Sequence, residues 1–265
     1  MLETFALYLL LGAIAGVLAG LLGIGGGLVV VPMLVFALPS QGVEMSILMQ
    51  LALGTSMAAI IFTATSSLKA HHKRGAVRWD VVWRISPGIV LGTFLGALVA
   101  SRMPTMALKI IFIVFLYYVA LQMFLNKKPK ASRTLPGITG MFGAGCTIGG
   151  MSSLVGIGGG TLSVPFMTWC NLPFHTVIGT SAAIGLPIAL AGTAGYVVGG
   201  LGNELLPPLS LGFVYGPALI GIVGASVLTA PLGVRLAHSL PVNTLKRFFA
   251  ALLILVATRM LVGLL

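Results

Sequence analysis

The chain has few charged residues and hardly any acidic ones. Only 7% of its 265 residues are Asp, Glu, Lys or Arg, and only four are acidic. A soluble globular domain carries about 25% charged residues, and so few polar side chains would not cover its surface. The composition therefore excludes a soluble enzyme. The 58% content of hydrophobic residues excludes a disordered chain as well.

Cysteine is also scarce. The two cysteines, Cys146 and Cys170, both lie in apolar stretches, which excludes a disulfide scaffold and a cysteine-rich metal site. The apolar runs are much longer than the segments of about ten alternating residues that build a membrane β-barrel. We therefore expect an all-α polytopic membrane protein.

Long apolar runs fill the sequence, and a membrane-spanning helix needs about 20 such residues. Six unbroken runs reach this length: 46–68, 79–100, 106–125, 174–198, 209–234 and 245–264. Two longer runs, 5–38 and 135–172, are each interrupted by the sequence GIGGG. All eight should be helical, because backbone in lipid must satisfy its own hydrogen bonds.

The two halves of the chain repeat one pattern. GIGGG occurs at 23–27 and again at 156–160, and Gly-Thr-Ser occurs at 54–56 and at 179–181. A third set of matches follows in the same order: Gly96, Pro104 and Lys109 with Gly233, Pro241 and Lys246. We interpret this as a duplication, with a first repeat at 1–125, a basic linker at 126–133 and a second repeat at 134–265.

Basic residues indicate how the repeats are oriented. The loop at 69–78 is rich in Lys and Arg, whereas its counterpart at 199–208 has none and carries Glu204. Because Lys and Arg mark cytoplasmic loops, equivalent loops should lie on opposite sides, which predicts an inverted repeat. Each unit would then be a glycine-turn hairpin followed by three transmembrane helices. Loop 69–78 and linker 126–133 would be cytoplasmic, and both chain ends would be outside.

An alternative topology treats each interrupted run as a single crossing. It gives eight spans and a parallel repeat, and it would place Arg235, Lys246 and Arg247 outside the cell. The hairpin topology instead puts most basic residues inside. The basic residues therefore set membrane orientation, and we expect no nucleic-acid partner.

The paired glycine turns are the first candidate site. Glycine lets a ligand approach the backbone closely, and the short run after each GIGGG would begin with unpaired N–H groups at the positive end of a helix dipole. Two such helix starts near the membrane centre would bind an anion. The other interpretation is that the glycines only permit a tight turn. The candidate residues are Gly25, Gly26, Gly27, Gly158, Gly159 and Gly160.

Paired hydroxyls are the second candidate. Thr55, Ser56, Thr180 and Ser181 fall inside predicted spans, about ten residues from an end. They could donate to an oxyanion, or they could bond their own or a neighbouring helix. Gln50 and His175 stand five residues before each Thr-Ser. His175 could titrate near neutral pH or cap its helix.

Acidic residues are absent from the middle of every predicted span. Cation transporters commonly place an acid there, so the pattern favours an anionic substrate. We expect no catalytic residues, no metal and no cofactor. A membrane-embedded enzyme would have only Cys146, Cys170 and His175 to work with, and no ligand spacing supports them.

The paired G-I-G-G-G-x-x-x-V-P blocks at 23–32 and 156–165, with the paired Gly-Thr-Ser blocks, resemble the TauE/SafE family of membrane transporters over essentially the whole chain. The resemblance implies export of a small sulfur-containing anion, such as sulfite or an organosulfonate. We therefore expect a gradient-driven, alternating-access exporter in the cell membrane, or else an anion channel of the same architecture. The expected partners are the anion and the lipid bilayer, and a homodimer is left open.

Overall fold

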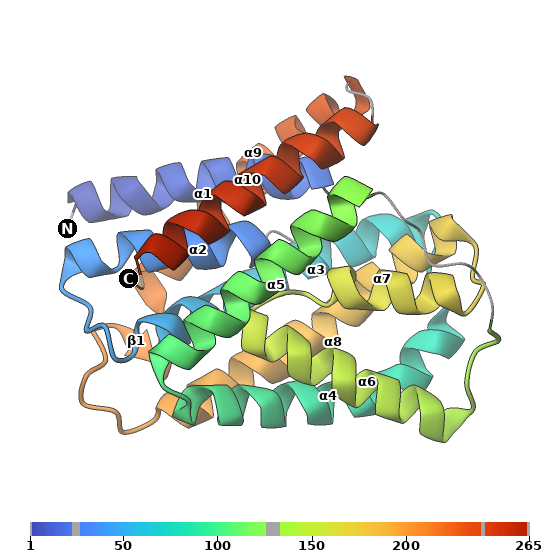
Figure 1. Cartoon of the computed structure of the whole chain (residues 1–265), viewed down its shortest axis with the longest axis horizontal. Coiled ribbons are helices and arrows are strands. Elements are labelled where there is room, and N and C mark those ends of the chain that lie inside the picture. Colours follow the sequence, from blue (N-terminus) through green and yellow to red (C-terminus); the bar gives the residue numbers. More distant parts are fainter. Residues whose placement is uncertain (1, 23–26, 126–132, 240–241, 264–265) are drawn as a thin grey trace.

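The protein is described by a computed structural model that covers residues 2–22, 27–125, 133–239 and 242–263 (Figure 1). Its helices in chain order are α1 (Leu2–Leu22), α2 (Gly27–Ala37), the short 3-10 helix η1 (Pro39–Gln41), α3 (Leu48–Lys73), α4 (Trp79–Arg102), α5 (Thr105–Leu125), α6 (Ile138–Val155), α7 (Gly160–Trp169), α8 (Phe174–Gly200), α9 (Gly216–Ser239) and α10 (Val242–Val262). Five of them, α3, α4, α5, α6 and α8, are long and apolar enough to cross a membrane. The expected all-α, multi-pass architecture is confirmed.

Both interruptions predicted at GIGGG are present. The helix α1 ends at Leu22 and α2 begins at Gly27, while α6 ends at Val155 and α7 begins at Gly160. In Figure 1, α2 runs back toward the end of the molecule where α1 starts, and the two chain termini lie at that same end. Gly25 and Gly26 lie outside the described residues.

The predicted span at 209–234 begins later than expected. Residues Ser210–Leu211 (β1) and Val214–Tyr215 (β2) form an antiparallel two-stranded hairpin, and α9 starts only at Gly216. The hairpin turns at Gly212, whose φ of +53° is in the left-handed region. The apolar residues of this segment resemble the start of a helix in the sequence. They form a hairpin instead, because Gly212 allows the chain to turn.

Helices from the two halves of the chain pack on each other in matching pairs. α1 packs along α9, and α6 packs along α4 (Figure 1). A Cβ added at Gly12 in α1 would lie 2.7 Å from Cα of Ile222, and one added at Gly145 in α6 would lie 2.5 Å from the carbonyl oxygen of Ile85. Gly12 and Gly145 are 133 residues apart, and Ile85 and Ile222 are 137 apart, which are the offsets of the sequence repeat. Glycine at these positions lets the helix backbones approach closely.

Candidate functional site

The start of α2, which follows the first GIGGG sequence, packs against the second glycine turn inside the protein. A Cβ added at Gly27, the first residue of α2, would lie 2.5 Å from the carbonyl oxygen of Gly156 and 3.1 Å from Cα of Ile157. The start of α2 therefore lies directly against the turn that precedes α7. Gly27 belongs to the first GIGGG sequence and Gly156 to the second, which lies 133 residues further along the chain.

The turn before α7 depends on two glycines with positive φ. Gly156, which ends α6, has φ of +69°, and Gly159, which precedes α7, has φ of +76°. L-residues rarely adopt this conformation, so glycine is required there. No side chain caps α7, and the N–H groups of Leu162 and Ser163 donate to the carbonyl oxygen of Gly159. Gly160 is the first residue of α7 and comes before Leu162 and Ser163 in the chain.

Two isoleucines cover this turn. A Cβ at Gly158 would lie 3.1 Å from Cγ2 of Ile60 in α3, and a Cβ at Gly159 would overlap Cδ1 of Ile188 in α8. Ile60 also approaches Gly27, so it lies near both the start of α2 and the second turn. Both isoleucines are buried.

The serines of the two Gly-Thr-Ser motifs contact the turn before α7 and α7 itself. The hydroxyl of Ser56 donates to the carbonyl oxygen of Gly156 at 3.0 Å. The hydroxyl of Ser181 pairs with that of Ser163 in α7 at 2.7 Å. One serine thus joins α3 of the first half to the turn of the second half, and the other joins α8 to α7.

The threonines of these motifs bond to backbone in the opposite half of the chain. Thr55 accepts a hydrogen bond from the N–H of Tyr215 at 3.0 Å, and Thr180 accepts one from the N–H of Arg78 at 3.0 Å. Tyr215 and Arg78 directly precede α9 and α4. These bonds join each helix to the other half of the chain, and a bond to a neighbouring element is the alternative that the sequence left open beside anion binding.

The depth of these threonines differs from the expectation. Thr55 lies about two turns from the start of the 26-residue α3. Thr180 lies about two turns from the start of the 27-residue α8. Both therefore lie in the first third of their helices. For Thr55 this is because α3 begins at Leu48 and continues to Lys73; Thr180 lies only six residues after the start of its predicted run as well.

Gln50 and His175 occupy different surroundings despite their matching positions. Gln50 is 4% exposed; its amide nitrogen donates to the carbonyl oxygen of Met103, and its amide oxygen accepts from the hydroxyl of Thr105, both at 2.8 Å. These bonds tie it to the connection between α4 and α5. His175 is exposed at the start of α8. The hydrogen bonds of Gln50 do not connect it to the turn before α7.

Two further hydroxyls at the second turn are absent from the sequence-based candidates. Ser152 and Thr161 are 0% and 9% exposed, and neither side-chain oxygen has a hydrogen-bond partner among the described residues. Such unpaired buried hydroxyls are rare in proteins. The available signal was their place on either side of GIGGG. The repeat conceals it, because the matching positions in the first half are Ala19 and Leu28.

A family model described as the sulfite exporter TauE/SafE matches residues 8–260 of the chain. The chain belongs to the TauE/SafE family. A protein of Haemophilus influenzae named "Probable membrane transporter protein" is 43% identical over 96% of this chain and 97% of its own length. "Probable membrane transporter protein YunE" of Bacillus subtilis is 28% identical over 84% of this chain and 88% of its own length. No solved structure matches the chain.

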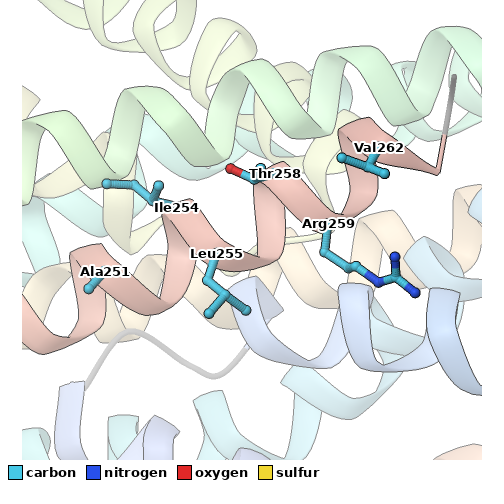
Figure 2. Close-up of a pocket in the computed structure, with 6 residues that line it drawn as sticks. All are labelled: Ala251, Ile254, Leu255, Thr258, Arg259 and Val262. Atoms are coloured by element: carbon cyan, nitrogen blue, oxygen red, sulfur yellow. The ribbon is translucent and has the colours of Figure 1, made fainter.

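This TauE/SafE chain also carries a surface groove of about 610 Å³ along α10 (Figure 2). In Figure 2, Thr258 points toward α5, where its hydroxyl bonds that of Tyr117 at 2.8 Å, and Arg259 points away from α5. The other lining residues are apolar: Ala251, Ile254, Leu255 and Val262. The groove has a single basic side chain and none of the turn residues, so it lacks the converging donors that hold an oxyanion.

Proposed function

We propose that this protein is a membrane transporter that exports a small anion, a sulfur oxyanion such as sulfite or an organosulfonate, across the cell membrane. The family description supports transport of this substrate class, and the names of the relatives support membrane transport. The observation that carries the proposal is the contact between the start of α2, at Gly27, and the turn that precedes α7.

Two helix starts at one place provide the chemistry that an anion needs. The first N–H groups of a helix lack partners within it, and they carry the positive end of the helix dipole. An oxyanion buried in a membrane must receive hydrogen bonds from the protein. We place the anion at the backbone of the paired turns, which comprises Gly25, Gly26, Gly27, Gly158, Gly159 and Gly160. Ser56 and Ser181 support the second turn and α7.

The matching contacts between the halves support an inverted repeat. α1 on α9 corresponds to α6 on α4, and Thr55 with Tyr215 corresponds to Thr180 with Arg78. In transporters with inverted repeats, one repeat moves against the other around a central site, so that the site opens to each side of the membrane in turn. We infer that the protein works by alternating access, driven by an ion or substrate gradient, with loop 69–78 and linker 126–133 in the cytoplasm.

A flux experiment tests the proposal. The purified protein is reconstituted in proteoliposomes and given sulfite, thiosulfate, sulfate or sulfoacetate, with and without an imposed proton gradient. Liposomes without protein are the control. We expect at least one sulfur anion to accumulate against its gradient. Flux that only ever runs downhill would contradict coupling to the proton gradient and favour the anion channel, and no flux of any of the four anions would contradict the proposal.

A further inference from the structure

We propose that the hydroxyls of Ser152 and Thr161 bind the oxyanion group of the substrate at the start of α7. The inference rests on the proposed anion site. It adds two side chains to that site and places the anion nearer to α7 than to α2. The second half of the chain supplies the hydrogen-bond donors from side chains, and the first half supplies only backbone.

The position of Ser152 points to this role. Its Oγ lies 3.6 Å from where a Cβ at Gly159 would be, so it faces the residue that precedes α7. Gly159 has no side chain to cap the helix. The space that a capping side chain would fill at this helix start is therefore next to the Ser152 hydroxyl.

Thr161 stands on the other side of the same turn, as the second residue of α7. Its hydroxyl is buried and unpaired among the described residues, as is that of Ser152. A buried hydroxyl without a partner costs free energy, because it has lost its hydrogen bonds to water. An anion held between α7 and these two hydroxyls would give each of them an acceptor.

Neighbouring hydroxyls show that the two unpaired ones differ from ordinary helical Ser and Thr. Ser153, adjacent to Ser152 and equally buried, donates to the carbonyl oxygen of Gly150 in its own helix at 2.7 Å. Thr168 of α7 donates to the carbonyl oxygen of Val164 at 2.8 Å. Ser and Thr in helices commonly bond their own backbone in this way. Ser152 and Thr161 do not.

The two halves of the repeat differ at the positions of these hydroxyls. Ser152 corresponds to Ala19 and Thr161 to Leu28, each 133 residues earlier. The first half therefore has no hydroxyl at either position. An oxyanion at the centre should lie closer to the start of α7 than to that of α2.

The variants Ser152→Ala and Thr161→Val test the inference, with Ser153→Ala and Thr168→Val as matched controls. Binding of sulfite, thiosulfate, sulfate and sulfoacetate is measured on purified protein by the shift that each anion causes in the thermal unfolding midpoint. The KM for flux is measured in proteoliposomes. Losing one hydrogen bond to a charged group corresponds to about a tenfold to hundredfold loss of affinity. We expect that loss in both test variants, wild-type affinity in both controls, and recovery in Thr161→Ser.

Each outcome separates this inference from the proposed function. If the wild type transports an anion and the two test variants keep its affinity, the inference is overturned and the transporter stands. If the wild type binds an anion in a manner that depends on Ser152 and Thr161 but moves none, the inference stands and the transport function fails. If the wild type binds none of the four anions, both are overturned.

Discussion

The hydroxyl of Thr55 accepts a hydrogen bond from the backbone N–H of Tyr215, a residue 160 positions further along the chain. Thr180 makes the equivalent bond to Arg78, and the neighbouring glycines, Gly54 and Gly179, pack against the carbonyl oxygens of Phe213 and Ala76. Each Gly-Thr-Ser motif thus holds the segment that leads into a helix of the other half. The two matching contacts show that the two halves hold each other in the same way.

Replacing Thr55 or Thr180 with Val should destabilise the protein. The N–H of Tyr215 or Arg78 would lose its acceptor, and a buried unpaired donor costs about 1–3 kcal/mol. The Ser variants keep the hydroxyl and should retain most of the stability. The measurement is the thermal unfolding midpoint of purified protein.

Thr65→Val in α3 and Thr193→Val in α8 are the matched controls for these two variants. Their hydroxyls bond carbonyl oxygens of their own helices, at Ile61 and Ala189, so their loss should change the midpoint little. Midpoints that fall equally in the controls and in the test variants would show that the bonds between the halves have no special importance.

Gly54→Ala and Gly179→Ala should also destabilise the fold. The added methyl group would overlap the carbonyl oxygen of Phe213 or Ala76, and forcing backbone apart in a packed interior costs about 1–3 kcal/mol. Gly143→Ala in α6 and Gly224→Ala in α9 have nothing within 4 Å of the added Cβ. These two controls should be neutral or slightly stabilising, because alanine favours helix. An equal loss of stability in all four variants would contradict the close approach of Gly54 and Gly179 to these carbonyl oxygens.

Much of this architecture is predictable because its signals are local. The interruptions at GIGGG and the order of the spans follow from glycine spacing and apolar length, and the structure confirms them. The hairpin at 210–215 does not follow, because its apolar residues resemble the start of a helix. It forms where Gly212 turns the chain and Phe213 donates to the carbonyl oxygen of Tyr196.

The candidate site was predictable only where both halves share it. Matching the repeats found the glycine turns and the Gly-Thr-Ser motifs, because these residues recur. It gave no reason to choose Ser152 or Thr161, since alanine and leucine replace them in the first half. It also could not reveal the partners of Thr55 and Thr180, which depend on how helices of different halves meet.

The orientation of the chain is testable by labelling. In a background of Cys146→Ala and Cys170→Ala, single cysteines are placed at Lys73 and Glu204, both exposed. Positive residues are retained in the cytoplasm, so a membrane-impermeant thiol reagent added to intact cells should label position 204 and not position 73. Permeabilised cells, in which both should react, provide the control. Labelling of position 73 from outside would contradict the proposed orientation.

The last prediction separates the structural role of the second turn from its role in transport. Gly159→Ala should lower both stability and flux, because φ there is +76° and the new methyl group would overlap Cδ1 of Ile188. Left-handed backbone costs an L-residue about 1–2 kcal/mol. Gly75→Ala, at φ of +65° with nothing within 4 Å of the added Cβ, has the same backbone strain without the overlap. It should lose some stability and keep its flux.

Adding Ile188→Val to Gly159→Ala removes the Cδ1 atom that causes the overlap, at a cost of about 0.5–1.5 kcal/mol for the lost methyl group. The overlap is then relieved, so the double variant should unfold at a higher temperature than Gly159→Ala alone. Its flux should stay low, because the alanine methyl group still lies 3.6 Å from the hydroxyl of Ser152, in the space proposed for the anion. The measurements are the thermal unfolding midpoint and flux in proteoliposomes for the two single variants and the double variant. If flux returned together with stability, the turn at Gly159 would serve only to shape the backbone, and the anion would have to bind elsewhere.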